Sequence, residues 1–167
     1  MSDPSFVAGL TVGDLGMAGE ISLFGLRASA CGRPTCCAVL RAFNGACGDD
    51  GPDALAAIVT FTYLLSTKGR RKVTLGMPGC GRITRDEWSF AEAFAATQAR
   101  RQAARDSHVA WLFADAPSPC AIQALGLGAA IFSEHGLMMR MPVPETPGGA
   151  GLMHPAWHRA PWSGTVH

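Results

Sequence analysis

Apolar residues recur at helical spacing over most of the chain and predict a mainly α-helical protein. The longest such segment, residues 52–67, is nearly all apolar, and its first residue is a proline. Proline is tolerated in the first helical turn because the N–H that it lacks would have no partner there. We expect this helix at the centre of the core, with Ile58, Phe61 and Leu65 on its buried face.

A second long helix is predicted to begin at Thr84. The sequence Thr84-Arg-Asp-Glu87 has the spacing of a capping box, in which the threonine hydroxyl and the glutamate each accept a hydrogen bond from a backbone amide at the start of the helix. The helix is predicted to continue to Arg105, because arginines near its end complement the helix dipole. Trp88 and Phe94 are expected to pack against the helix over 52–67.

Shorter elements complete the predicted fold, which is a single compact bundle of five or six helices with at most a short two-stranded β-ribbon. Proline, serine, aspartate and glycine mark the ends of the remaining helices, which we expect near residues 18–30, 34–47, 106–113 and 118–134. Alternation of polar and apolar residues over 71–75 predicts a strand, and 137–141 is a second candidate strand.

Three segments of different composition are expected along the chain, whose length of 167 residues suits one domain. Residues 1–17 are rich in glycine and aspartate and are predicted to form an irregular arm. Residues 18–141 form the predicted helical domain. Residues 142–167 are rich in proline and glycine and are predicted to be a tail.

Charge and hydropathy exclude several classes of protein. The 14 basic and 13 acidic residues give no net field that would favour nucleic acid as a partner. No apolar run approaches the ~18 residues of a membrane span, and the first residues do not resemble a signal peptide. We therefore expect a cytoplasmic protein with reduced thiols. Charged residues make up 16% of the chain, below the usual ~25%, which suits a surface partly covered by a partner.

The six cysteines do not predict a metal site or any other cofactor. Cys31, Cys36, Cys37 and Cys47 lack the paired spacings of zinc and iron–sulfur ligands. If Cys36 and Cys47 share one helix, they lie ~16 Å apart along its axis and cannot bind one ion. We expect these four as small buried hydrophobic residues, although a metal site that joins some of them to distant residues stays open.

Two other cysteines are candidates for reactive thiols. Cys120 follows Pro119 at a predicted helix start, where the helix dipole favours the thiolate. Cys80 lies in a glycine-rich loop between Lys72 and Arg82, whose positive charges have the same effect.

The same loop approximates a phosphate-binding motif. Gly76 and Gly81 have the motif's spacing, but Arg82 replaces the lysine, Thr84 is displaced by one position and Pro78 removes an amide. Nucleotide or phosphate binding at residues 76–84 is therefore kept as a second alternative.

Basic residues around this loop form a candidate anion contact, which would bind an acidic surface of a partner. They are Lys72, Arg82 and Arg85. Aromatic residues do not alternate with them, so nucleic acid is not expected.

The tail carries the residues that best predict a protein partner. Trp157, Arg159 and Trp162 are of the types that anchor protein interfaces. Adjacent Asp106-Ser107-His108 does not make a catalytic triad, and no Gly-x-Ser-x-Gly motif is present. The leading hypothesis is a non-enzymatic accessory or adaptor subunit that binds a larger protein complex through its termini. The first alternative is a thiol-dependent redox or metal-binding protein that uses Cys80 or Cys120.

The two stretches 70–75 and 78–87, Arg-Arg-Lys-Val-Thr-Leu and Pro-Gly-Cys-Gly-Arg-Ile-Thr-Arg-Asp-Glu, resemble an uncharacterised family of small bacterial helical proteins. The resemblance covers about residues 20–130. It implies a helical lead-in, a basic strand, a turn that carries a cysteine, and a helix start with this capping box. No activity follows from it. The Cys36-Cys37 pair and the tail depart from the pattern.

Overall fold

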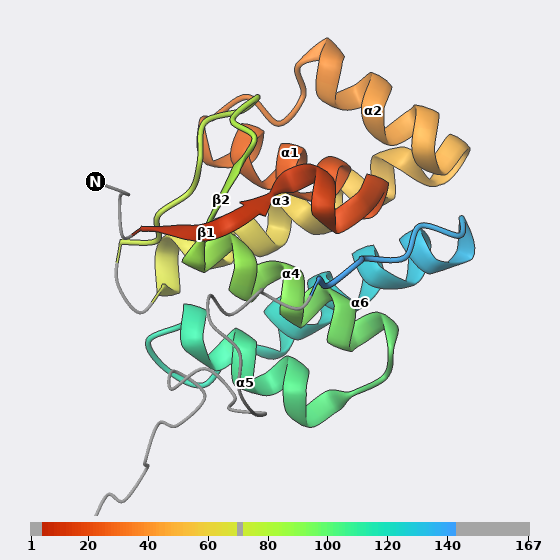
Figure 1. Ribbon diagram of the computed structural model, residues 1–167. Coiled ribbons are helices and arrows are strands. Elements are labelled where there is room, and N and C mark those ends of the chain that lie inside the picture. The colour runs from red at the N-terminus through yellow and green to blue at the C-terminus, as the bar shows by residue number, and fades with distance from the viewer. Residues whose placement is uncertain (1–4, 70–71, 143–167) are drawn as a thin grey trace, which may run out of the picture.

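The computed structural model describes residues 5–69 and 72–142, and within them it confirms a helical fold with a short two-stranded sheet (Figure 1). The six α-helices of this part of the chain are α1 Gly16–Ala30, α2 Cys37–Cys47, α3 Gly51–Lys68, α4 Arg85–Gln98, α5 Gln102–Leu112 and α6 Pro119–Glu134. Two 3-10 helices, η1 Val12–Leu15 and η2 Gly48–Asp50, precede α1 and α3. Strands β1 Phe6–Thr11 and β2 Arg82–Thr84 form an antiparallel sheet.

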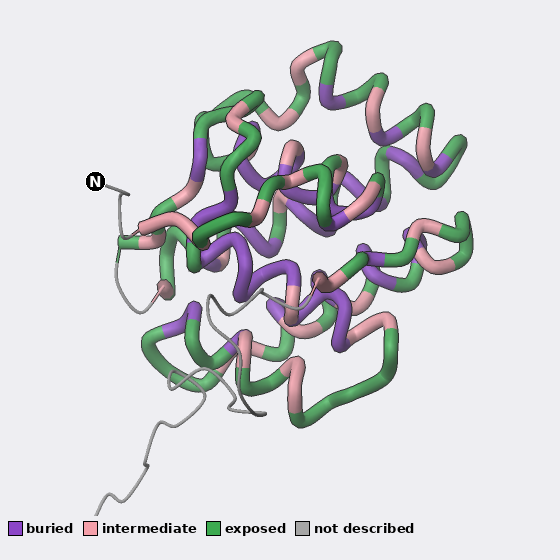
Figure 2. The backbone as a smooth tube through the Cα atoms, viewed as in Figure 1, coloured by how far each residue is buried: buried purple, intermediate pink, exposed green. Residues whose placement is uncertain are grey.

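Helix α3 lies at the centre of the fold, as its composition predicts. It packs against α1, α2 and α6, while α4 packs against α5 and α6. The inward faces of these helices carry most of the buried positions (Figure 2). No helix in the described ranges is both long enough and apolar enough to cross a membrane.

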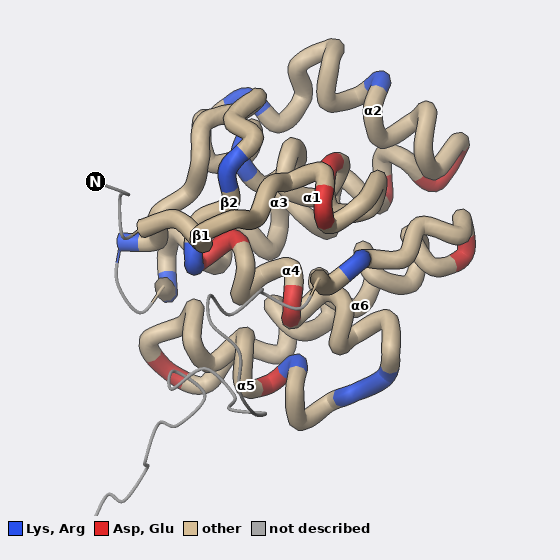
Figure 3. Tube along the Cα trace, viewed as in Figure 1, with Lys and Arg blue, Asp and Glu red and all other residues tan. Residues whose placement is uncertain are grey.

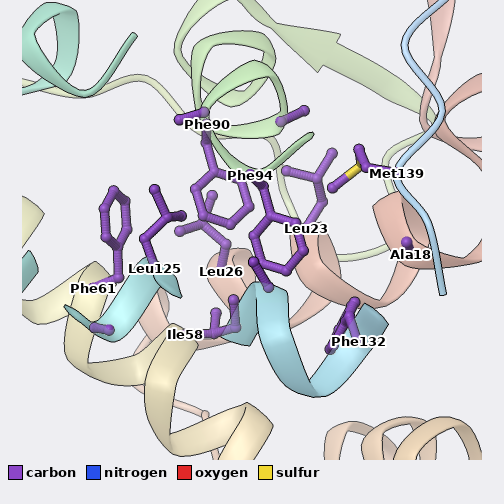
Figure 4. Packing of buried hydrophobic residues seen from close by; sticks show 14 of the residues in the cluster. Ala18, Leu23, Leu26, Ile58, Phe61, Phe90, Phe94, Leu125, Phe132 and Met139 are labelled. Carbon is purple, nitrogen blue, oxygen red and sulfur yellow. The ribbon is translucent and has the colours of Figure 1, made fainter. Parts of the chain in front are cut away.

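A chain of phenylalanine rings joins α3 to the second half of the fold. The ring centre of Phe61 lies 5.5 Å from that of Phe90 and 5.8 Å from that of Phe113. Phe94 lies 5.3 Å from Phe132 of α6 (Figure 4). The residues predicted to face the core are all buried, as expected: Ile58, Phe61, Leu65, Trp88 and Phe94. The contact of Phe61 with Phe90 joins α3 to α4.

The predicted helix over 85–105 is two helices, so this prediction is wrong. Helix α4 ends at Gln98, and Arg100 adopts φ 55°, the left-handed conformation that glycine usually supplies at a helix end. The amide of Arg101 donates to the carbonyl of Ala96 at 2.8 Å, which closes this terminal motif. Because the position holds arginine and not glycine, no residue in this stretch marks the break between the helices.

The two strands also differ from those predicted. Strand β1 lies within residues 1–17, where an irregular arm was expected, and it pairs with β2. The pairing runs from Phe6 opposite Thr84 to Thr11 opposite Arg82, and β1 bulges between these pairs at Gly9, whose φ is 73°. Glycine and the irregular register hide the alternation by which a strand is recognised.

Neither segment predicted as a strand pairs as one. The amide of Thr74 donates to the Asp86 carboxylate at 2.8 Å instead of to a neighbouring strand. The segment 137–141 is held by Gln98, whose side chain accepts from the amide of Met139 at 2.9 Å, and by the carbonyl of Leu15, which accepts from the amide of Arg140 at 3.0 Å. A carboxylate side chain therefore takes the place of a neighbouring strand in the first segment, and a side-chain amide and a helix carbonyl take its place in the second.

Replacing Phe61 by alanine is expected to lower the free energy of unfolding by about 3–5 kcal/mol, because the ring contacts are lost and a cavity remains. Denaturant-induced unfolding of the purified variant measures the change. Tyr63→Ala on the same helix is the matched control, because Tyr63 is 65% exposed. Equal costs for the two variants would contradict the packing described here.

Candidate functional site

A buried ion pair joins α1 to the first turn of α4. Arg27 Nε lies 2.6 Å from Glu87 Oε1, and Arg27 Nη2 lies 2.9 Å from Glu87 Oε2. The side chains are 3% and 0% exposed. Two parallel hydrogen bonds of this kind are the strongest geometry for an arginine and a carboxylate.

The other N–H groups of Arg27 hold the loop that precedes α4. Nη1 donates to the carbonyl of Cys80, with a longer contact of 3.4 Å to that of Met77, and Nη2 donates to that of Arg82 at 2.7 Å. The guanidinium therefore uses all five of its donors.

Glu87 binds the same loop from the other side. Its Oε1 accepts from the amide of Gly76 and its Oε2 from the amide of Thr84, both at 2.8 Å. The Glu87 amide donates to the hydroxyl of Thr84 at 3.1 Å, which confirms the predicted capping box. We call these contacts of Arg27 and Glu87 the Arg27–Glu87 network. Across residues 5–69 and 72–142, no buried side-chain nitrogen or oxygen lacks a hydrogen-bond partner.

The network presents a tight turn at residues 77–80 to solvent. The amide of Cys80 donates to the carbonyl of Met77 at 2.9 Å, and Gly79 has φ 87°. Proline second and glycine third are the residues of a type II turn. Met77 is 69% exposed, although its carbonyl lies inside the network.

The three basic residues of the candidate anion contact are all exposed in this part of the structure. They are Lys72, Arg82 and Arg85. Their acidic neighbours Asp86 and Glu87 are buried, so the surface here is positive (Figure 3). The guanidinium of Arg82 lies 3.8 Å from the ring centre of Phe6, a cation–π contact between β2 and β1.

Two of the backbone amides at the ends of the candidate phosphate-binding loop are engaged within the protein. The amides of Gly76 and Thr84 donate to Glu87, so a carboxylate of the protein occupies the place of an anion. The Thr84 hydroxyl donates to the carbonyl of Thr74 at 2.7 Å. No strand leads into the loop within residues 72–81.

All six cysteines fall within the described residues and are free thiols. Cys80 is half-buried in the turn, and Cys120 is exposed in the first turn of α6, where the Ser118 side chain caps the helix. No group of three metal-ligating side chains occurs in the described part of the chain.

The expectation that four cysteines are buried is wrong for three of them. Cys31 and Cys37 are exposed and Cys36 is intermediate, because Cys36 precedes α2 and the helix begins at Cys37. The buried stripe of α2 consists of Val39, Phe43 and Cys47. Burial, reinforced by the nearby Asp50 carboxylate, raises the pKa of the Cys47 thiol.

A second ionisable pair links α4 to α5. His108 Nε2 lies 3.8 Å from Glu92 Oε2. Burial raises the pKa of the Glu92 carboxyl, and the charge of Arg101 acts in the opposite direction. Asp106 pairs with Arg105 at 2.8 Å, so the run of residues 106–108 does not converge on one point.

A cavity of about 460 Å³ lies between α3, the end of α1 and residues 72–75. Several hydroxyls line it, but Thr62 and Ser66 each donate to a carbonyl of their own helix at 2.7 Å. Its lining includes Lys72 and no carboxylate, histidine or cysteine among the described residues. Lys72 and Tyr63 are the ionisable side chains among its described lining residues.

The predicted partner-binding residues Trp157, Arg159 and Trp162 lie outside the described residues. Comparisons with protein-family models, with curated proteins and with solved structures give no match. The resemblance to a family of small bacterial proteins thus stays a prediction. Arg27 is the functional residue that sequence reasoning missed, since nothing in its helix marks it as buried.

Gly76→Ala is expected to destabilise the fold by about 1–3 kcal/mol, because the added Cβ overpacks a filled site. That atom would lie 2.8 Å from Arg27 Nη2, which the network holds in place. Gly81→Ala in the same loop is the control, since its Cβ meets open space. Unfolding free energies measure both, and a harmless Gly76→Ala would show that Arg27 can move aside.

A thiol reagent is expected to modify the exposed Cys31, Cys37 and Cys120 in the native protein and Cys47 only after unfolding. Burial shields Cys47, and its raised pKa leaves less thiolate at any given pH. Timed labelling followed by peptide mass spectrometry measures each rate. A Cys120 or Cys80 that reacts far faster than Cys31 and Cys37 would instead favour a thiol-dependent activity.

Proposed function

We propose that the protein is a non-enzymatic accessory or adaptor subunit that binds a larger protein assembly. One observation carries this proposal: the Arg27–Glu87 network fixes the backbone of an exposed turn. A catalytic carboxylate must be able to exchange a proton or bind a substrate. Glu87 is fully buried, and four hydrogen bonds occupy its two oxygens.

The energetics of such a network favour a role in conformational specificity. Removing two charges from water costs about as much as their attraction returns, so a buried ion pair adds little net stability. What it adds here is one defined shape for a loop that contains three glycines and a proline between residues 76 and 81. A loop that is ordered before binding loses less entropy in the complex, which strengthens binding.

The tail is the second element of the proposal. The folded part holds the chain just before it, because the amide of Arg140 donates to the carbonyl of Leu15 at 3.0 Å. Arg140, two residues before the tail, is therefore held to the folded domain. Trp157, Arg159 and Trp162 would supply the anchors for the partner.

A thiol-dependent function is the other candidate, and the position of Cys120 favours it. Its exposed thiol lies in the first turn of a 16-residue helix, where a reagent or substrate can reach it. The labelling rates described above separate this candidate from the adaptor.

Deleting the chain after Met141 is expected to leave the melting temperature unchanged and to remove the bound partners. A proline- and glycine-rich segment adds little to the core, whereas hot-spot tryptophans contribute about 2 kcal/mol or more each to binding. Affinity purification followed by native mass spectrometry compares the full chain with the deletion.

Two point variants make this test specific. Trp157→Ala with Trp162→Ala should reproduce the loss of partners, while Trp111→Ala, at a position that is 40% exposed on α5, should retain them. A fall in melting temperature would mean that the tail packs on its own domain. Partners retained by the deletion would remove the tail from the proposal.

A further inference from the structure

We propose that the 77–80 turn is itself a recognition element, whose Met77 side chain enters an apolar pocket on an acidic protein surface. This inference rests on the proposed adaptor function and names a contact other than the tail. The argument uses the turn's shape, the exposure of Met77 and the charges around it.

Met77 combines a fixed backbone with a free side chain. Its carbonyl accepts from the amide of Cys80 at 2.9 Å and contacts Arg27 Nη1 at 3.4 Å. Its side chain is 69% exposed, the largest exposure among the large hydrophobic residues of the described chain. Methionine adapts to irregular apolar pockets because it is unbranched and polarisable. An apolar side chain held out from a rigid turn has the geometry of an interface anchor.

Arg85 contributes a positive charge to the surface but does not stabilise helix α4. It is the first residue of α4 and is exposed, and a positive charge is unfavourable at this end of a helix dipole. Asp86 and Glu87, which suit that position, point inward and are buried. The first turn of α4 therefore exposes the guanidinium of Arg85, whereas its two carboxylates are buried. Arg82 of β2 is a second exposed cation (Figure 3).

The neighbouring strand β1, Phe6–Thr11, carries no charged residue and so adds no negative charge to this side. Beyond β1, the exposed carboxylate of Asp14 in η1 accepts a hydrogen bond from the amide of Thr11 at 2.7 Å and from its hydroxyl at 2.8 Å. These hydrogen bonds lower the pKa of the Asp14 carboxyl. A positive face with an apolar centre is complementary to an acidic surface that surrounds an apolar pocket.

Nucleic acid fits this face less well than an acidic protein does. Residues 72–85 contain no aromatic side chain on which a base could stack. The ring of Phe6 lies beside them, but the Arg82 guanidinium covers it at 3.8 Å. The amides of Gly76 and Thr84, which could bind a phosphate, donate to Glu87.

Selection of phage-displayed random peptides on the intact protein tests the inference. We expect the selected peptides to carry several acidic residues beside a large apolar residue. Their affinity should fall about tenfold or more with Met77→Ser, as for an interface anchor. It should fall with Arg85→Gln as well, and less so in high salt, where the charge is screened.

Matched variants separate binding from folding. Met138→Ser and Leu127→Ser should leave the affinity unchanged, since both residues are about half exposed on other parts of the surface. Met77→Ser and Arg85→Gln should keep the wild-type melting temperature, because neither side chain belongs to the core.

Three results would overturn the inference. The first is a set of selected peptides without acidic and large apolar residues. The second is unchanged peptide affinity in the Met77→Ser variant. A single-stranded oligonucleotide could bind in a way that Arg85→Gln abolishes and Met77→Ser does not. If the tail variants lose their partners while Met77→Ser changes nothing, the adaptor function stands and the turn has no part in it.

Discussion

The ion pair between Arg27 and Glu87 is the interaction that holds α1, the start of α4 and the loop before it together. The two residues are 60 positions apart, and neither charge could be buried without the other. Their eight hydrogen bonds with each other and with the loop bring together α1, the start of α4 and residues 76–84. Because Arg27 lies on α1 and Glu87 on α4, the pair requires both helices in their packed positions, and the shape of the loop depends on the helical core as well as on its own sequence.

The apolar core and the Arg27–Glu87 network stabilise different parts of the structure. Phenylalanine rings connect α3, α4 and α6 and fix how the helices cross, through contacts that have no fixed direction. The hydrogen bonds of Arg27 are directional and fix a segment that has little apolar surface. The β1–β2 sheet then covers the outer side, with Phe6 beneath the Arg82 guanidinium.

Periodicity and caps predicted the helices well, because the apolar faces of α3 and α6 and the capping box at Thr84 are local signals. The break at Arg100 was missed, since a non-glycine residue in the left-handed conformation has no sequence marker. Strand β1 was missed because its bulge at Gly9 disturbs the alternation. The site was recognised in part: Glu87 was assigned as a cap, but its long-range partner Arg27 resembles any arginine at a helix end. Such a pairing depends on tertiary structure, which no window of sequence contains.

The four hydrogen bonds to the Glu87 carboxylate also limit which functions the loop can have. A carboxylate that accepts four hydrogen bonds in a dry site can neither bind a ligand nor transfer a proton unless several of these bonds break together. Chemistry at this carboxylate would therefore require the loop to open, and opening would expose the Arg27 charge without a partner. The same cooperativity resists distortion when another molecule presses on the turn. A glycine-rich segment that would be mobile in isolation thus becomes a rigid surface feature, and rigidity at an exposed apolar residue is worth more to recognition than to catalysis.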